Sequence, residues 1–180
     1  MTAVFFDRDD TLIKDVPYNG NPALVELMPN ARAACQKLRE HGFALFIISN
    51  QSGVGLGVIT PAQVDAVNDR VLELLGQDLF AGIYCCYDRP DDVPNCRKPS
   101  PKMLIQASRE HDIDLGASFI VGDRPSDVLA GKNAGCSAIL YRPKEKIINA
   151  EDAAALADFV ADDLRGAAEW IISSAQATAR

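Results

Sequence analysis

Short apolar runs alternate with amphipathic stretches along almost the whole chain, and this alternation restricts the fold more than any other feature of the sequence. The apolar runs predict five strands: Ala3–Phe6, Phe43–Ser49, Gly82–Cys86, Ser118–Gly122 and Ser137–Tyr141. The amphipathic stretches predict four helices: Asn30–His41, Pro61–Leu75, Pro101–His111 and Pro125–Asn133. We therefore expect a Rossmann-like three-layer α/β/α sandwich around a central parallel sheet, because strands that alternate with helices pair in parallel and are covered on both faces.

The end of the chain continues this pattern. Asp158–Val160 predicts a last short strand, and Asp162 is expected to cap a final helix that runs through Trp170 to about Ser173. No repeat or long linker interrupts the chain, so residues 1–180 are interpreted as one domain. Only Ile13–Gly42 separates the acidic segment after the first predicted strand from the second strand, which leaves no room for a large cap domain.

Composition and charge narrow the classes of function. The formal net charge of −7 disfavours nucleic-acid binding through a basic surface, but not binding of a small phosphorylated metabolite. No apolar stretch is long enough to span a membrane and no secretory leader is apparent, so we expect a cytoplasmic protein without a membrane partner. The apolar stripe of the helix at Pro61–Leu75 fits a core-facing surface better than a dimer seam, which suggests a monomer or a weak homodimer.

Two acids directly follow the first predicted strand. Asp7 and Asp9 are two residues apart, so in an extended backbone their side chains project to the same side. Carboxylates held this close repel each other unless a cation or a shared proton relieves the repulsion. A charged turn after a strand is the plain alternative, because aspartates are common in turns.

Polar residues also follow the later strands or precede the helices. Ser49–Gly53 follows the second strand, Cys96–Pro99 precedes the third helix, and Gly122–Asp127 follows the fourth strand. In a parallel sheet these positions meet at the carboxyl edge, where ligands bind. Acids, a hydroxyl and cations gathered there suit phosphoryl transfer, which requires positioning and charge compensation.

The order Asp-x-Asp-x-Thr, Ser-Asn, Lys-Pro and Gly-Asp-x-x-x-Asp resembles the haloacid dehalogenase superfamily of phosphohydrolases. Four segments are similar to its subfamily IIIA, the branch of the histidinol-phosphatases and the D-glycero-D-manno-heptose-1,7-bisphosphate phosphatases: Asp7–Leu12, Ile48–Gly53, Cys96–Pro101 and Val121–Asp127. The resemblance covers nearly the whole chain. It implies magnesium-dependent hydrolysis of a small phosphomonoester, such as a sugar phosphate, through an aspartyl-phosphate.

The resemblance also implies catalytic roles for matching residues. Asp7 would be the nucleophile and Asp9 the general acid and base, while Ser49 and Lys98 would stabilise the transferring phosphoryl group. One Mg²⁺ would be held by Asp7, the main-chain carbonyl of Asp9, and Asp123. From the residues alone, Ser49 could instead cap a turn and Lys98 could be a solvated loop charge.

Further residues match substrate-lining or supporting positions. The resemblance implies that six residues contact substrate: Asp15, Tyr18, Asn50, Gln51, Ser52 and Arg97. Three more are expected to support the site: Thr11, Arg124 and Asp127. Asp127 would orient Lys98 or the metal shell, although it could also form only a pair on a helix surface.

The chain departs from the family pattern at two places. Asp10 occupies a position that is usually glycine, where a side chain reduces backbone freedom and adds negative charge, so altered activity is expected. Many members also carry a Cys-x-His…Cys-x-Cys zinc loop, of which only Cys86 and Cys96 remain, with Asp88 and Pro94 at other ligand places. We therefore expect no zinc. Cys85, Cys86 and Cys96 are expected as reduced thiols, and Cys35 and Cys136 as core residues.

Three alternatives to a sugar-phosphate phosphatase stay open. Histidinol phosphate is the rival substrate within the same branch. Asp10 leaves room for a relative that binds a phosphorylated ligand without turnover. A receiver-type signalling domain shares the expected topology, but an acid two residues after the nucleophile favours hydrolysis.

Overall fold

The computed structural model describes residues 1–93, 95–143 and 151–178, and a six-stranded sheet in the order β3-β2-β1-β4-β5-β6 forms its centre. The strands are β1 (Ala3–Phe6), β2 (Ala44–Asn50), β3 (Phe80–Cys86), β4 (Phe119–Gly122), β5 (Ser137–Tyr141) and β6 (Phe159–Ala161). Every neighbouring pair in the sheet is parallel, which confirms the prediction from strand and helix alternation.

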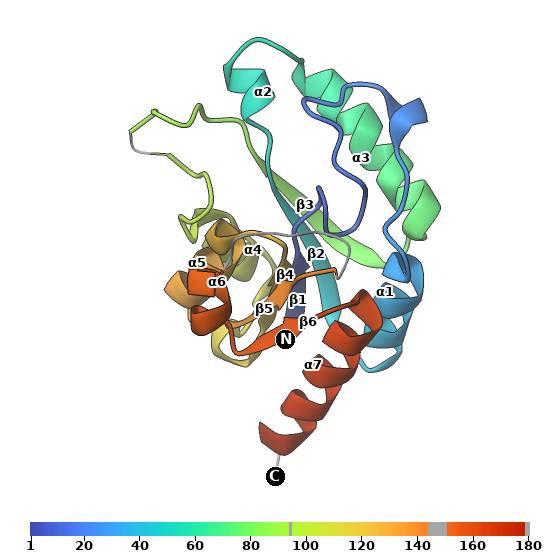
Figure 1. The fold of residues 1–180 in the computed structure, drawn as a ribbon, viewed down its shortest axis with the longest axis vertical. Coiled ribbons are helices and arrows are strands. Elements are labelled where there is room, and N and C mark those ends of the chain that lie inside the picture. The colour runs from blue at the N-terminus through green and yellow to red at the C-terminus, as the bar shows by residue number, and fades with distance from the viewer. Residues whose placement is uncertain (94, 144–150, 179–180) are drawn as a thin grey trace.

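Helices cover both faces of the sheet (Figure 1). On one face lie α1 (Ala31–Glu40), α3 (Pro61–Leu75) and α7 (Leu164–Thr178). On the other face lie α4 (Lys102–His111), α5 (Pro125–Ala134) and α6 (Glu151–Leu156). The short α2 (Ser52–Gly55) follows β2 directly. The expected three-layer α/β/α arrangement is confirmed.

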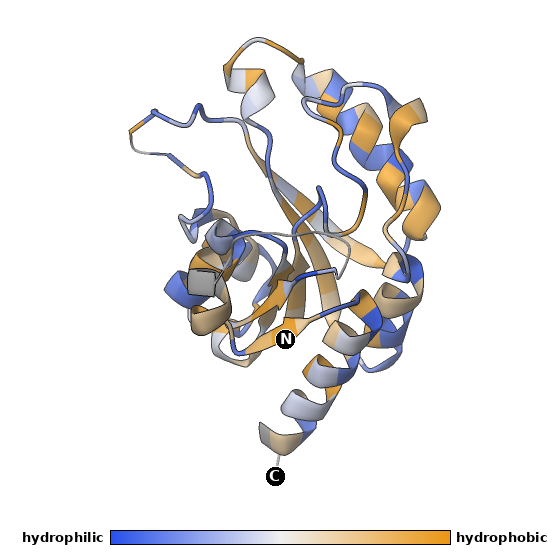
Figure 2. Ribbon diagram, in the orientation of Figure 1, coloured by the Kyte–Doolittle hydropathy of each residue, from blue (hydrophilic) through white to orange (hydrophobic). Residues whose placement is uncertain are grey.

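The strands divide their side chains between two apolar layers. Val4 and Phe6 of β1 pack with the α1, α3 and α7 side, while Phe5 packs with α4 and α5. This alternation follows from the two-residue period of a strand. Figure 2 shows mostly hydrophobic strands at the centre, and helices in which hydrophobic and hydrophilic residues are mixed. Cys35 and Cys136 are buried in these layers, as predicted.

Several element boundaries differ from the predictions. β3 begins at Phe80 rather than Gly82, because Gly82 lies inside the strand, near a register shift against β2. Asp163, not Asp162, caps α7, since its Oδ1 accepts a hydrogen bond from the Gly166 amide at 2.7 Å. The short helices α2 and α6 were not predicted, because four and six residues give too little periodicity. The predicted cap at Thr60 is confirmed, with a capping box to Gln63.

The strand order reverses at β1. After β1 the chain adds β2 and β3 on one side, and β4, β5 and β6 lie on the other. Beyond β1 the Asp7 amide donates to the Val121 carbonyl of β4 at 2.9 Å, so the ladder continues to the sheet edge. A ligand crevice is expected at such a switch point, outside the carboxyl ends of the strands.

The described ranges contain no cap domain inserted between β1 and β2 or after β2, which agrees with the prediction. None of the helices in the described ranges has the length and apolar composition that would be required to cross a lipid bilayer.

Candidate active site

A cavity of about 330 Å³ opens at the carboxyl ends of β1 and β2. All four polar segments contribute to its walls. The predicted site residues that line it are Asp7, Asp9, Asp15, Tyr18, Ser49, Asn50, Gln51, Ser52, Arg97, Lys98, Arg124 and Asp127. Groups from distant parts of the sequence thus meet at one mouth, as expected for the carboxyl edge of a parallel sheet.

The centre of the cavity is a buried cluster of one ammonium and two carboxylates. Lys98 Nζ lies 2.5 Å from Asp7 Oδ1 and 2.5 Å from Asp127 Oδ1. Lys98 Nζ also donates to the Ile48 carbonyl at 3.2 Å. The approach of Asp127 requires a glycine at 122, because a Cβ there would lie 2.4 Å from the Asp127 Cβ. Burial of these charges is tolerated because each has a close partner of opposite sign.

The pKa values of Asp7 and Lys98 are both raised, but for different reasons. Burial raises the pKa of the Asp7 carboxyl well above its ordinary value; Lys98 opposes the shift, while the neighbouring acids Asp127, Asp9 and Asp123 add to it. Burial alone would lower the pKa of Lys98, but the Asp127 and Asp7 carboxylates outweigh it and raise that pKa. Lys98 therefore stays charged, and ionised Asp7 gains from any additional cation.

The acids are placed to hold a divalent cation. Carboxylate oxygens of Asp7, Asp123 and Asp127 lie within 4.8 Å of one another. Asp123 is 3% exposed and does not itself line the cavity. Hard oxygen donors with an excess of negative charge fit Mg²⁺. The donor set thus matches the predicted metal, with Asp127 as an additional carboxylate beside it.

Asp9 lies on the same wall but has different partners. Gln51 Nε2 donates to Asp9 Oδ2 at 2.9 Å and to Ser49 Oγ at 2.8 Å. The Ser49 hydroxyl itself lies 3.5 Å from Asp9 Oδ2. The Arg8 guanidinium forms a salt bridge with Asp9, 3.1 Å from Nη2 to Oδ2. The ends of β1 and β2 therefore fix this carboxylate together.

Asn50 fixes the backbone of the basic segment. Its Oδ1 accepts from the Lys98 amide at 2.9 Å, and its Nδ2 donates to the Lys98 carbonyl at 3.3 Å. The paired contact resembles one rung of a sheet ladder. It attaches the loop residue Lys98 to the last residue of β2.

The loop at Asp15–Tyr18 forms the outer rim. Asp10 Oδ1 accepts a hydrogen bond from the Asp15 amide at 3.1 Å. Arg124 Nη2 lies 3.6 Å from Asp15 Oδ2. Tyr18 packs over Gly53, where an added Cβ would lie 2.7 Å from the Tyr18 ring. The loop thus rests against the segments that follow β2 and β4.

Asp10 adopts a backbone φ of +60°, in the left-handed region that favours glycine. This explains why glycine is common at this position. An aspartate tolerates the conformation better than most residues, and here its side chain also supports the rim loop.

One predicted supporting residue lies apart from the cavity. Thr11 is fully buried, and its hydroxyl has no hydrogen-bond partner among the described residues. Conversely, the sequence interpretation did not single out three residues that line the cavity: Arg8, Asn19 and Ser126. Arg8 stood only as the variable position between two acids. The signal that could have identified Arg8 is a basic residue directly after a strand that is expected to be buried.

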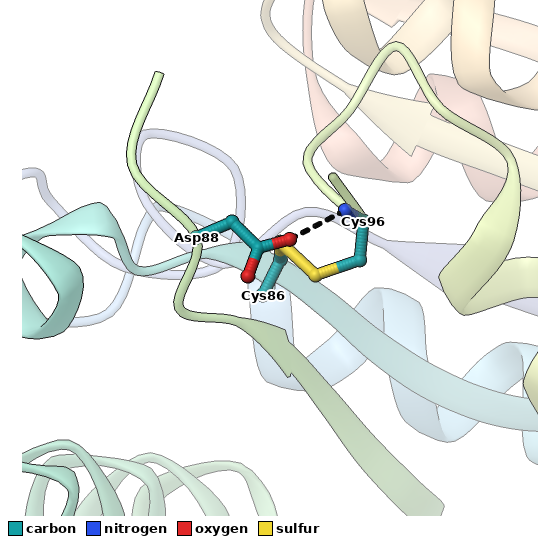
Figure 3. Close-up of side chains that lie close together, drawn as sticks. All are labelled: Cys86, Asp88 and Cys96. Atoms are coloured by element: carbon teal, nitrogen blue, oxygen red, sulfur yellow. Dashed lines mark hydrogen bonds between the residues drawn. A yellow bond between two sulfur atoms is a disulfide. The ribbon is translucent and has the colours of Figure 1, made fainter. Parts of the chain in front are cut away.

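The prediction of reduced thiols was wrong for Cys86 and Cys96 and is confirmed for Cys85. Cys86 and Cys96 form a disulfide, with their Cα atoms 5.6 Å apart (Figure 3). Asp88 Oδ2 accepts from the Cys96 amide at 2.7 Å, so the loop returns to the end of β3. The spacing of Cys86 and Cys96 in the sequence did not predict that the loop turns back to β3. Cys85 keeps a free thiol, and burial raises its pKa.

A zinc ion at this place is a separate question. The sulfurs of Cys86 and Cys96 and a carboxylate oxygen of Asp88 lie within 4.8 Å of one another. In the disulfide form the two cysteines offer no thiolates, and the thiolate is the form in which cysteine binds zinc. Pro94 lies outside the described residues. That no zinc binds here stays a prediction.

Comparisons with known proteins agree with this geometry. Residues 95–167 match a family model described as HAD-hydrolase-like. The D-glycero-beta-D-manno-heptose-1,7-bisphosphate 7-phosphatase of Yersinia pestis is 37% identical, over 90% of this chain and 90% of its own. The D-glycero-D-manno-heptose-1,7-bisphosphate 7-phosphatase of Thermosynechococcus vestitus is 33% identical, over 94% of each chain.

A solved structure is similar as well. It is the D,D-heptose 1,7-bisphosphate phosphatase of B. bronchiseptica, complexed with magnesium and phosphate. Its TM-score is 0.83 at 27% identity, and the match covers 97% of this chain and 99% of the relative. The likeness therefore extends over the sheet and both helical layers.

Proposed function

This chain belongs to the haloacid dehalogenase-like hydrolases, in the branch of the D-glycero-D-manno-heptose-1,7-bisphosphate 7-phosphatases, and on that premise we propose that it is a magnesium-dependent sugar-phosphate phosphatase. The observation that carries the proposal is the contact of Lys98 with Asp7 and Asp127 at the mouth shared with Asp9. Residues 1–180 act as one phosphatase domain.

The first step is attack of the Asp7 carboxylate on phosphorus. An Asp7 oxygen forms the new P–O bond while the bond to the sugar oxygen breaks, which gives an aspartyl-phosphate and the free alcohol. Lys98 contacts Asp7 at 2.5 Å and offsets negative charge on the phosphoryl oxygens. Ser49, on the same wall, donates its hydroxyl to the phosphoryl group.

Asp9 moves the protons. It gives a proton to the departing sugar oxygen, and its carboxylate then takes a proton from the water that hydrolyses the aspartyl-phosphate. Inorganic phosphate and the free Asp7 carboxylate result. The position of Asp9 beside Ser49 and Gln51 supports this role.

Asp7, Asp123 and the Asp9 carbonyl would hold Mg²⁺, which when bound neutralises charge between the carboxylates and the phosphoryl oxygens. Asp127 supports the site through Lys98. The raised pKa of Asp7 fits this scheme, because a cation would favour its ionised, nucleophilic form.

For the substrate we propose a heptose 1,7-bisphosphate, as in the relatives. Arg97 and Arg124 line the cavity and suit a second phosphate on the same sugar. Asp15 and Tyr18 on the rim would select the sugar. The open mouth fits a small metabolite in the cytoplasm.

The test is hydrolysis by the purified chain with Mg²⁺, using D-glycero-D-manno-heptose 1,7-bisphosphate, histidinol phosphate and 4-nitrophenyl phosphate. We expect the heptose bisphosphate to have the highest kcat/KM, and Asp7→Asn to abolish turnover. Asp78→Asn, in an exposed turn before β3, is the matched control with unchanged turnover. A preference for histidinol phosphate would overturn the substrate proposal. Equal background rates in the wild type and Asp7→Asn would overturn the proposal that this chain is an enzyme.

A further inference from the structure

Arg8 is buried beside the cavity, yet the chemistry proposed above does not use it. It is 1% exposed, although it lies between two acids at the end of a strand. Its position explains the direction of its side chain. Val4 and Phe6 face the layer that contains α3, and the two-residue period carries Arg8 to the same side.

The guanidinium holds the Asp9 carboxylate with a two-pronged contact. Arg8 Nε lies 3.3 Å from both carboxylate oxygens of Asp9, and Nη2 lies 3.2 and 3.1 Å from them. Two N–H groups that meet one carboxylate fix its plane as well as its distance. An ammonium at the same place would provide charge without this orientation.

The third nitrogen of Arg8 is anchored on another element. Nη1 donates to Asn68 Oδ1 of α3 at 2.7 Å, a contact that spans 60 positions in the chain. Asn68 is itself 6% exposed, and its Nδ2 donates to the Cys85 sulfur of β3 at 3.6 Å. The guanidinium is therefore held from behind by α3 and β3.

We propose that Arg8 is the positioning residue for proton transfer by Asp9, with Asn68 as its anchor. The inference rests on the proposed function, in which Asp9 serves as acid and base. A proton donor must lie within hydrogen-bond reach of the leaving oxygen, and small displacements reduce its contribution strongly. Gln51 fixes Asp9 from the β2 side, and Arg8 fixes it from the β1 side.

A purely structural role for Arg8 predicts a different result. If Arg8 only stabilised the fold, its loss would slow all substrates alike. If it positions the proton donor, the loss depends on the leaving group, because a weakly basic phenolate departs without a proton while a more basic one needs it. The ratio of two rates therefore separates the two roles.

The experiment compares 4-nitrophenyl phosphate with phenyl phosphate, which has the more basic leaving group, under saturating Mg²⁺. Asp9→Asn sets the reference pattern. We expect Arg8→Met to lower kcat/KM for phenyl phosphate by at least about tenfold more than kcat/KM for 4-nitrophenyl phosphate, because kcat/KM reports the step in which the leaving group departs, before the aspartyl-phosphate is hydrolysed. Asn68→Ala should give the same pattern at a smaller size, and it serves as the second test if Arg8→Met does not fold.

The possible results separate the two proposals. Equal losses for both esters in Arg8→Met and Asn68→Ala would overturn the positioning role, while a leaving-group effect in Asp9→Asn would leave the proposed function standing. A wild-type protein that hydrolyses neither these two esters nor D-glycero-D-manno-heptose 1,7-bisphosphate would overturn the proposed function, and this inference with it. Thermal unfolding of each variant shows whether the fold is retained.

Discussion

Lys98 Nζ lies 2.5 Å from a carboxylate oxygen of Asp7, although the two residues are 91 positions apart in the chain. The contact joins the end of β1 to the segment that precedes α4. Both side chains are almost fully buried, and Asp127 reaches the same ammonium from α5. Three elements are thus held together by charges that are also proposed to act on the substrate.

Replacement of Lys98 by methionine is expected to damage stability and turnover together. It leaves two buried carboxylates without their cation, which costs about 3–5 kcal/mol of unfolding free energy. The lost charge compensation should lower kcat by roughly 10²–10³-fold. Urea denaturation and 4-nitrophenyl phosphate hydrolysis measure the two effects.

The matched control for Lys98 is Lys14→Met, which removes an exposed ion pair with Glu26. Its expected cost is at most about 1 kcal/mol, with kcat unchanged. Similar losses in both variants would contradict a special role for the buried cluster.

Asp10 provides a test of the departure from the family pattern. Because its φ is +60°, glycine at this position relieves the backbone but loses the hydrogen bond to the Asp15 amide. The two effects oppose each other, so Asp10→Gly should change the unfolding free energy by less than about 1 kcal/mol. Asp10→Ala loses the bond without relief and should be roughly 1–2 kcal/mol less stable than Asp10→Gly. Equal stability of the two variants in urea denaturation would refute this account.

The Cys86–Cys96 disulfide is expected to stabilise the fold without setting the catalytic rate. It closes a loop with a sequence separation of 10. Loss of a cross-link around a loop of this size costs roughly 3 kcal/mol. Cys96→Ser, or reduction by a dithiol, should therefore lower the unfolding free energy, while kcat stays within about threefold because Lys98 keeps its contacts to Asp7 and Asn50.

Two controls accompany the disulfide prediction. Cys85→Ser removes the neighbouring free thiol and should leave the effect of the dithiol unchanged. Asn50→Ala should show the opposite pattern, with kcat lowered about tenfold because the Lys98 backbone loses its anchor. Alkylation followed by mass spectrometry tests the bond itself, and labelling of both Cys86 and Cys96 without reductant would disprove it.

Asp158 gives a pH-dependent term in stability. Burial alone would raise its pKa, but hydrogen bonds from Lys132 and from the Ala138 amide outweigh burial and lower the pKa below its ordinary value of 3.8. The ionised form therefore stabilises the folded state above pH 3.8, and this contribution is lost as the pH falls through the lowered value.

Asp158→Asn should consequently reduce the unfolding free energy at pH 7 by less than about 1 kcal/mol, because the pair is partly exposed. The difference from the wild type should be equal at pH 7 and pH 5 and should shrink towards pH 3.5. Urea denaturation at these values checks it. A difference that grows as the pH falls has the wrong sign for this interpretation.

The sequence was informative where structure is local and regular. Buried strands read as apolar runs, and Thr60-Pro61 marked the start of α3, because a cap and a first-turn proline are short-range signals. The acids after β1 and β4 were located because parallel strands end at one edge. The same principle correctly placed Ser49 and Lys98 beside these acids at the cavity.

The features that the sequence did not predict depend on contacts between residues that are distant in the chain. Arg8, just after β1, contacts Asn68 of α3, and no pattern around Asp7-Arg8-Asp9 contains that partner. The disulfide depends on how the loop after β3 turns back, which two cysteine positions do not specify. The choice of Asp163 over Asp162 as cap is set by where β6 ends, at Ala161, and such boundaries vary by a residue or two.

The paired contact between the Asn50 side chain and the Lys98 backbone has a consequence for divergence among related chains. Asn50, the last residue of β2, holds the Lys98 backbone in place. The loop after β3 is therefore not needed to position the ammonium of Lys98. Its length and its cross-link are then free to change over generations without moving the Lys98 ammonium away from Asp7. Differences in this loop among related chains would then alter the stability of the fold and not the reaction.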